Sequence, residues 1–284
     1  MSIITVSESG NASTSVSTPA LKKVIVKTNL VLYGSGFLEP NHTGVGSHNA
    51  GDNFKKVAEA RQAINEKNNP YQINKIYYCP TDYDFFKIIN DSKNIIRLDI
   101  YCHGWLHGIN LGGFKGKRLI KGLEIDGDKL DWNNKNENQG KDLRRVEIHE
   151  DLYLNSTEKT ELLKLKKDMF DSNVEVYFWG CNIGGQLSPS GKHIAQNKSI
   201  KHNIPLMEDP KQSFAQKFAE HISKGNVYAL VGKGVAAGSV FKTDLNKKVI
   251  YFDGEMLPAN IAANKKYTNT VTLKAINYMK KFPL

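Results

Sequence analysis

Short apolar runs alternate with amphipathic segments along most of the chain. Apolar runs predict buried strands at residues 21–33, 73–79, 95–102, 174–179 and 227–231, and a further strand at 248–252. Helical spacing of apolar residues predicts helices at 52–66, 82–89, 157–170, 213–222 and 269–280. In the helix at 157–170 the expected buried face consists of Leu162, Leu163, Leu165, Met169 and Phe170. This alternation predicts a three-layer α/β fold, with a mostly parallel six-stranded sheet and helices on both faces.

Three segments lie outside this alternating pattern. Residues 1–20 are rich in Ser and Thr and are expected to form a flexible tail, which leaves 21–284 as a single domain. Residues 115–156 are polar and predict an insertion between the third and fourth strands, with its own strand pair at 118–125 and 144–154. Residues 186–208 are expected to form a polar loop.

Composition narrows the class of protein. The 284 residues are 40% hydrophobic and 24% charged, which is ordinary for a globular domain and excludes a wholly disordered chain. No apolar run approaches the roughly 20 residues of a membrane-spanning helix, and no secretory signal is visible. Three cysteines cannot all pair, which favours a reducing compartment or a functional thiol. We therefore expect a cytoplasmic protein, or one exported without a classical signal peptide.

A histidine and a cysteine follow two successive apolar strands. His103-Gly104 comes directly after the third strand, and Gly180-Cys181 comes after the fourth. Ligands of open parallel sheets bind beyond the carboxyl ends of the strands. If the two strands are neighbours, the imidazole could take the proton of the thiol, as a thiol nucleophile requires. Either residue could instead be a structural group at the end of a strand.

The glycines beside this pair fit the same chemistry. The backbone N–H groups of Gly104 and Cys181 could hold the oxyanion of a tetrahedral intermediate. Gly184 and Gly185 leave room for a substrate backbone.

The two segments together resemble the signature of the caspase-like cysteine peptidases. The first segment reads LDIYCHG at residues 98–104, and the second reads VYFWGC at 176–181. The resemblance covers roughly residues 21–255 and implies a caspase-like fold. It also implies that His103 is the acid and base, Cys181 the nucleophile, and the N–H groups of Gly104 and Cys181 the oxyanion hole. The gap of 181 − 103 = 78 residues is longer than is usual in that family, and the insertion would account for it.

Other residues near the strand ends have lesser expected roles. The expected wall and rim of a substrate cleft consist of Gly34, Ser35, Trp105, His107, Asn182 and Gly184. His107 lies four residues after His103, but no acidic or cysteine partner stands nearby, so we expect no metal site and no cofactor. Cys79 and Cys102 are expected in the core, and Asp99 is expected to form an ion pair.

The sequence thus favours a cysteine endopeptidase acting on protein or peptide, for example a bacterial effector or a self-processing peptidase. A non-catalytic α/β module that binds at the same rim stays open as the alternative. A nucleic-acid partner is disfavoured because the chain lacks clustered Arg and interleaved aromatic residues. The net charge of +10 also admits a polyanionic activator, although acidic residues interleave with the candidate cations Lys115, Lys117, Arg118, Lys121, Arg144 and Arg145.

Overall fold

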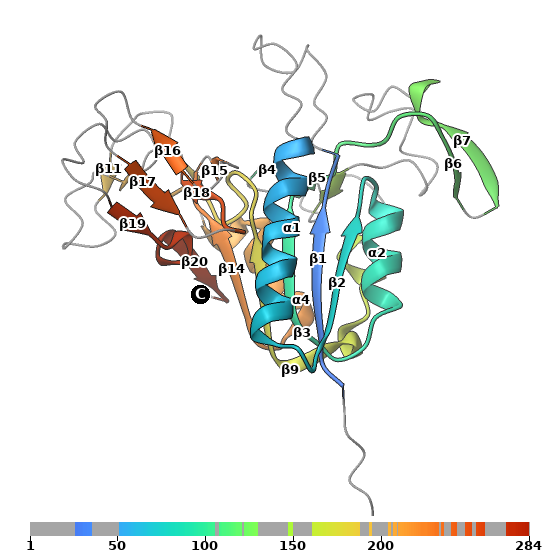
Figure 1. Cartoon of the computed structure of the whole chain (residues 1–284), viewed down its shortest axis with the longest axis horizontal. Helices are drawn as coiled ribbons and strands as arrows, with labels where there is room; N and C mark the ends of the chain where they lie inside the picture. The colour runs from blue at the N-terminus through green and yellow to red at the C-terminus, as the bar shows by residue number, and fades with distance from the viewer. Residues whose placement is uncertain are drawn as a thin grey trace, which may run out of the picture.

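A six-stranded sheet forms the centre of the molecule, in the order β2–β1–β3–β9–β14–β20 (Figure 1). Its strands are β1 (Thr28–Tyr33), β2 (Ile73–Tyr78), β3 (Ile95–Tyr101), β9 (Phe170–Phe178), β14 (Asn226–Leu230) and β20 (Met279–Phe282). The first five are mutually parallel, and β20 is antiparallel to β14. The computed structural model describes residues 26–35, 51–105, 108–120, 122–129, 147–149, 161–187, 193–194, 204–205, 207–208, 210–232, 234–235, 240–242, 248–251, 254–258 and 271–283. The predicted α/β class with a mostly parallel six-stranded sheet is confirmed.

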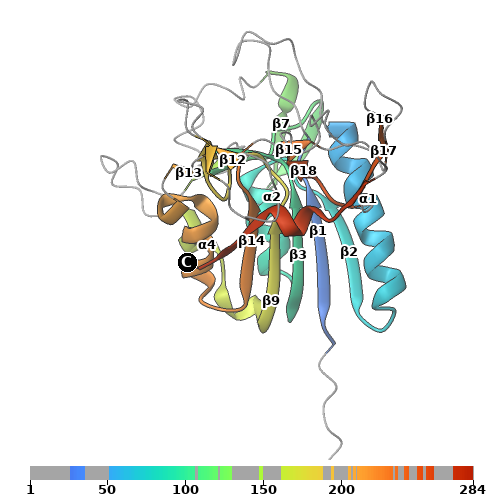
Figure 2. The same cartoon turned by 90° about the vertical axis from the view of Figure 1, so that its left-hand side faces the viewer.

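Helices pack on both faces of this sheet, as predicted. Helix α1 (Gly51–Asn68) covers one face, and α2 (Asp82–Asn90) and α4 (Phe214–Ile222) cover the other. Figure 2 shows α1 and α4 on opposite sides of the strands. Each of the two shorter helices begins at a hydroxyl N-cap, since Thr81 and Ser213 accept hydrogen bonds from the backbone N–H three residues on.

Alternating residues of the strands supply the two apolar cores. On the face of α2 and α4, Leu30, Leu98 and Phe178 pack with Phe85 and Phe214, all fully buried. On the face of α1, the core consists mainly of Val31, Phe54, Val57, Tyr101, Tyr177 and Trp179. Burying each large apolar side chain contributes about 1.5–3 kcal/mol. The two cores therefore hold the strands, and the loops at their ends, in a fixed relation.

The remaining described strands form small separate sheets. Strands β4 (His103–Trp105), β5 (Gly108–Asn110) and β8 (Glu147–His149) form one, and β16 (Val240–Lys242), β17 (Lys248–Tyr251) and β19 (Val271–Leu273) form another. Two-stranded pairs join β6 (Lys117–Ile120) to β7 (Leu123–Asp126), β10 (Gln186–Leu187) to β13 (Met207–Glu208), β11 (His193–Ile194) to β12 (Ile204–Pro205), and β15 (Gly234–Val235) to β18 (Leu257–Pro258). The predicted loop at 186–208 therefore contains four short strands.

The predicted pairing of segment 118–125 with segment 144–154 in the insertion is wrong. The segment 118–125 folds back on itself as the β6–β7 hairpin, which extends away from the central sheet (Figure 1). Strand β8 pairs with β5 instead. The hairpin packs through the buried Ile120 and Ile125 on Phe114, and Arg118 forms an ion pair with Asp84 of α2 at 3.1 Å.

The predicted helix at 157–170 is wrong over its described part. Residues Glu161–Lys164 and Lys167–Met169 form two 3₁₀ turns, and Phe170 already begins β9. Two backbone carbonyl groups of this segment contact side chains of other elements. Asn90 donates to the Lys164 oxygen, and the His221 ring lies 3.0 Å from the Leu165 oxygen. Leu162 and Leu165 are buried, but Leu163 is 61% exposed, so the leucines do not share one helical face.

In the C-terminal region one predicted strand is found and one predicted helix is not. The strand at 248–252 is present as β17, but it belongs to a separate sheet and not to the central one. The expected helix at 269–280 is instead β19, a 3₁₀ turn over Ala275–Tyr278, and the start of β20. Strand β20 completes the central sheet because Phe282 is fully buried on the face of α4. The expected tail at 1–20 lies outside the described residues, and among the helices that are described none has both the length and the apolarity to cross a bilayer.

Candidate functional site

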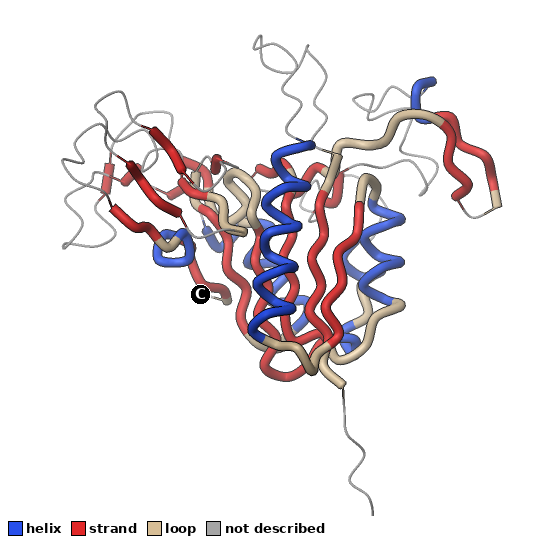
Figure 3. The backbone as a smooth tube through the Cα atoms, viewed as in Figure 1, coloured by secondary structure: helices blue, strands red, loops and turns tan. Residues whose placement is uncertain are grey.

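The segments that follow β3 and β9 meet at the carboxyl edge of the sheet. These two strands are adjacent and parallel, with Ile100 paired to Phe178. His103 and Cys181 each stand three residues beyond this pair, since 103 − 100 and 181 − 178 both equal 3. The backbone continues the pairing for one more step, because the Trp179 N–H donates to the Ile100 oxygen at 2.8 Å. Figure 3 shows both strands leaving the sheet at the same end as β1.

Two glycines allow these segments to touch. A Cβ on Gly104 would lie 2.4 Å from the Ile183 side chain and 3.0 Å from the Cys181 oxygen. A Cβ on Gly180 would lie 2.4 Å from Ile183 and 2.8 Å from the Cys102 oxygen. Both distances to Ile183 are too short for a real Cβ, so the glycines are required by close packing around this fully buried residue. The sequence did not reveal this packing reason.

The three cysteines differ in exposure. Cys79 and Cys102 are buried, as predicted, whereas Cys181 is partly exposed. Burial raises the pKa of the Cys79 thiol and that of the Cys102 thiol well above the ordinary value. Both buried thiols are therefore neutral at physiological pH, and Cys181 is the cysteine that reagents can reach.

The backbone of Gly234 contacts the sulfur of Cys181. The Gly234 N–H donates to Sγ at 3.2 Å, and the Sγ lies 3.6 Å from the Gly234 oxygen. Gly234 opens β15, shortly after the carboxyl end of β14. Sequence analysis missed this residue, although Gly232 and Gly234 follow an apolar strand as Gly104 and Gly180 do.

His103 is held between a short sheet and α1. It begins β4, where it pairs with Asn110 of β5. Its ring lies edge-to-face on Phe54, with ring centroids 5.1 Å apart and the planes at 73°. Phe54 is 3% exposed, so α1 provides a rigid apolar surface for the imidazole. Sequence analysis identified Phe54 only as a core residue of a helix.

The residues expected in the cleft take several positions. Gly34 and Ser35 follow β1 and contact Leu111, which comes directly after β5: the Ser35 N–H and Oγ both donate to the Leu111 oxygen, at 2.8 and 3.2 Å. Asn182 is partly exposed and left-handed, with φ of 59°, and its N–H donates to the Gly232 oxygen at 2.7 Å.

The remaining expected cleft residues are less informative. Gly184 is buried, and a Cβ there would lie 2.9 Å from the Ala229 oxygen, so its missing side chain permits close packing on β14. The backbone of Trp105 lies in β4, but its side chain is outside the described part of the chain, and so is the whole of His107.

Asp99 forms the predicted ion pair behind this edge of the sheet. It is fully buried and accepts from Arg97 Nε at 2.6 Å, from Arg97 Nη2 at 3.0 Å and from Trp179 Nε1 at 2.9 Å. Burial lowers the pKa of Arg97, but the Asp99 carboxylate more than offsets this and raises it above the ordinary value. The Arg97 guanidinium therefore stays charged at physiological pH.

Arg61 of α1 joins this group to the loop before β18. Its guanidinium lies 3.9 Å from Asp99 Oδ1, and its Nε and Nη2 donate to the Gly254 oxygen at 3.2 and 3.1 Å. The Tyr101 hydroxyl donates to the same oxygen. Gly254 has φ of 74°, and a Cβ there would lie 2.8 Å from the Arg61 backbone. Strand β18 follows directly and pairs with β15, which carries Gly234.

The basic residues expected to bind a polyanion are only partly described. Lys117 lies 2.8 Å from Glu124, and Arg118 is paired with Asp84. Lys115 is exposed, whereas Lys121, Arg144 and Arg145 lie outside the described residues. Lys117 and Arg118 thus already have carboxylate partners.

Comparison with known proteins gave no lead to the chemistry of this edge. No family model, curated protein or solved structure matches the chain.

Proposed function

We propose that the protein is a cysteine peptidase with a caspase-like fold, in which Cys181 is the nucleophile and His103 the general acid and base. The observation that carries the proposal is the equal offset of the two residues. Each stands three residues beyond the paired Ile100 and Phe178 of adjacent parallel strands. Cys181 is also the one cysteine of the three that is not buried.

The proposed reaction needs only these two side chains and water. The His103 imidazole accepts the Cys181 proton, and the thiolate attacks the carbonyl carbon of a peptide bond, which forms a C–S bond and a tetrahedral oxyanion. When the C–N bond breaks, the imidazolium gives its proton to the leaving amine. The imidazole then takes a proton from water, which hydrolyses the thioester and frees Cys181.

Backbone N–H groups support both charged species in this scheme. The oxyanion is assigned to the N–H groups of Gly104 and Cys181, as the resemblance to caspase-like peptidases implies. The Gly234 N–H points at the sulfur, and a hydrogen bond to sulfur is stronger for a thiolate than for a thiol. Phe54 limits the motion of the His103 ring and is a positioning residue in this scheme.

The substrate is a protein or peptide, laid along the carboxyl edge of the sheet. Ser35 and Asn182 flank this edge from β1 and β9, and both are partly exposed. No cofactor enters the scheme, and an activating polyanion is not required by it.

The direct test is cleavage of a degenerate peptide library, read by mass spectrometry. We expect new termini with the wild type and none with Cys181→Ala or His103→Ala. Cys102→Ala is the matched control, because this neighbouring thiol is buried and should be dispensable. Circular dichroism melts of all four proteins must show that each is folded.

The outcomes separate peptidase function from its alternatives. Cleavage that persists in Cys181→Ala would assign the activity to a contaminant and contradict the proposal. A wild type that cleaves nothing and whose Cys181 reacts slowly with electrophiles, independently of His103, would favour a non-catalytic binding module. A steeply salt-dependent retention on DNA would favour a nucleic-acid partner instead.

A further inference from the structure

One transverse row of the central sheet is polar across five strands. Strand register aligns Asn74 of β2 with Asn29 of β1, Asn29 with Arg97 of β3, Arg97 with Glu175 of β9, and Glu175 with Asn226 of β14. The row lies on the face that α1 covers, where a parallel sheet is ordinarily apolar. Two residues further along, the same face carries Val31, Tyr177 and Tyr228. An aligned polar row in this position calls for a role other than core packing.

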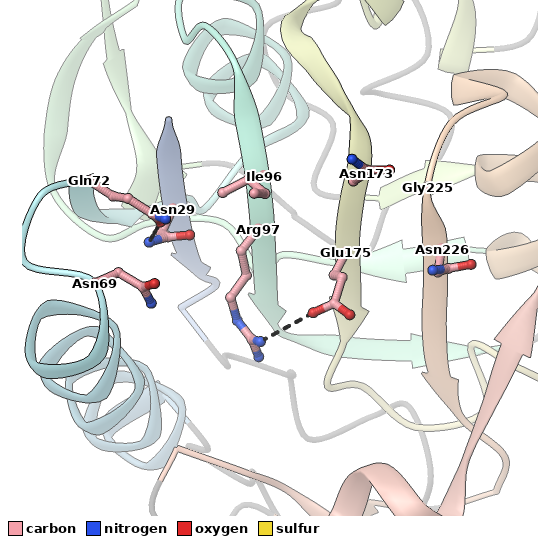
Figure 4. Close-up of a pocket in the computed structure, with 9 residues that line it drawn as sticks. All are labelled: Asn29, Asn69, Gln72, Ile96, Arg97, Asn173, Glu175, Gly225 and Asn226. Carbon is pink, nitrogen blue, oxygen red and sulfur yellow. Dashed lines mark hydrogen bonds and ion pairs between the residues drawn. The ribbon is translucent and has the colours of Figure 1, made fainter. Parts of the chain in front are cut away.

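The row forms the floor of a cavity of about 420 Å³ at the amino end of the sheet (Figure 4). Its members Asn29, Arg97, Glu175 and Asn226 line the cavity, and further lining comes from Asn69, Gln72, Ile96, Asn173 and Gly225. A volume of this order is typical of small-molecule sites. Cys181 lies six residues beyond Glu175 in the chain, past the end of β9 and about 20 Å away, so this cavity is separate from the proposed peptidase site.

The side chain of Asn29 lies in the floor of the cavity, and its amide oxygen can still accept a hydrogen bond. Its side chain is 2% exposed, and its amide nitrogen donates to Gln72 Oε1 and Asn74 Oδ1, both at 2.7 Å. Both N–H groups are therefore used. Figure 4 shows the remaining oxygen turned away from Gln72 and toward β3. A carbonyl oxygen that faces the cavity can accept a hydrogen bond from a bound molecule.

Arg97 and Glu175 place opposite charges in the middle of the cavity. Arg97 uses Nε and Nη2 on Asp99, and its Nη1 lies 3.8 Å from Glu175 Oε2. That separation is too long for a hydrogen bond. Glu175 Oε2 also accepts from the Tyr177 hydroxyl at 2.9 Å, and the Glu175 side chain is 44% exposed. A donor and an acceptor thus face each other across a gap, next to the acceptor of Asn29.

We infer that this cavity binds a neutral polyhydroxylated ligand of the size of a mono- or disaccharide. A hydroxyl both donates and accepts, so adjacent hydroxyls can satisfy Arg97 Nη1, Glu175 and Asn29 together. An anionic ligand would be repelled by the Glu175 carboxylate, whose partner Arg97 is shared with Asp99. A cationic ligand would have to displace the Arg97 guanidinium from Glu175. The amides of Asn69, Asn173 and Asn226 supply further donors and acceptors at the rim.

The test compares neutral and charged sugars by saturation-transfer NMR at pH 6.5 with the full chain. The neutral probes are the methyl α-glycosides of glucose, galactose and mannose, and the charged probes are glucosamine and glucuronate. We expect at least one neutral glycoside to bind with a Kd of about 1 mM, and the charged probes to bind at least about tenfold more weakly. Asn226→Ala should weaken binding about fivefold, the loss of one hydrogen bond.

Glu175→Gln provides the sharper variant because it keeps the shape and removes one charge. This variant should bind the neutral glycoside more weakly, and the difference in affinity between the neutral glycoside and glucuronate should become smaller. Glu124→Gln, which changes an exposed carboxylate on the β6–β7 hairpin, should change neither. The inference is overturned if no neutral glycoside binds at 20 times the expected Kd, if only a charged probe binds, or if Asn226→Ala and Glu175→Gln both bind like the wild type.

Discussion

The backbone N–H of Gly234 lies 3.2 Å from the sulfur of Cys181, although 53 residues separate them in the chain. Gly234 is held there by the pairing of β15 with β18. The loop before β18 is in turn fixed on α1, where Arg61 donates two hydrogen bonds to the Gly254 oxygen. The position of the Gly234 N–H at the sulfur therefore depends on a contact at α1.

Replacing Gly254 by Ala should loosen this connection. Gly254 has a positive φ and no room for a Cβ, which would lie 2.8 Å from the Arg61 backbone. Gly122→Ala is the matched control, because Gly122 has φ of 78° but nothing within 4 Å of the added Cβ. In both variants an alanine must adopt a positive φ, which lowers the free energy of unfolding by about 1 kcal/mol. In Gly254→Ala the steric clash should lower it by at least about 1 kcal/mol more, as measured by urea unfolding.

The same pair of variants tests the connection to Cys181. Gly254→Ala should change the rate at which iodoacetamide alkylates Cys181, and Gly122→Ala should leave it at the wild-type value. Equal rates in all three folded proteins would show that the sulfur does not depend on the Gly254 loop.

Removing the Asp99 carboxylate should be among the most damaging changes in the core. Asp99→Ala leaves the guanidinium groups of Arg97 and Arg61 and the indole N–H of Trp179 without their shared partner. Breaking a buried ion pair on one side costs about 3–5 kcal/mol. Asp91→Ala, which removes a 62% exposed partner of Lys87, should cost less than about 1 kcal/mol. Urea unfolding of both variants measures the difference, and similar losses would contradict the assigned role of Asp99.

Stability should fall at alkaline pH. Burial raises the pKa of Cys102 and of Tyr101 above their ordinary values of about 8.5 and 10. Above those values the unfolded chain releases protons that the folded chain retains. The stabilisation is therefore complete below about pH 8.5 and is lost as the pH rises, by about 1.4 kcal/mol per pH unit for each group.

Two variants assign this alkaline loss to its groups. Urea unfolding between pH 7.5 and 11 gives the slope of the free energy of unfolding against pH. In Cys102→Ala and in Tyr101→Phe this slope should correspond to about one proton fewer released on unfolding. Tyr71→Phe should leave the slope unchanged, because Tyr71 is 95% exposed. A slope that neither core variant alters would contradict the buried, neutral state of these groups.

Sequence patterns predicted the parallel part of the fold because buried strands and amphipathic helices have strong local signatures. Each of the five parallel strands contains a short segment rich in apolar residues, and α2 and α4 begin at hydroxyl caps. Strand β20 could not be predicted in this way. Two of its four residues, MKKF, are lysines, and it is a strand because Phe282 is buried and because it pairs with β14. The leucines of 161–165 likewise suggested a helix, whereas tertiary contacts of the carbonyl groups favour two 3₁₀ turns.

The candidate sites show the same limit. His103 and Cys181 were identifiable because each directly follows an apolar strand. Gly234 and Phe54 were not, because their contacts with these residues depend on the packing of segments far apart in the chain. The polar row from Asn74 to Asn226 also has no sequence signature, since it exists only in the register of five strands.

The pH profile of Cys181 alkylation tests the central claim most directly. Iodoacetamide labelling is followed by peptide mass spectrometry from pH 5 to 9 in the wild type and in folded His103→Ala. If His103 takes the proton of Cys181, the wild type should still react at pH 6, at least about tenfold faster than His103→Ala. The variant should react only as an ordinary cysteine titrates, near pH 8.5. Superimposable profiles for the two proteins would contradict a Cys181–His103 pair.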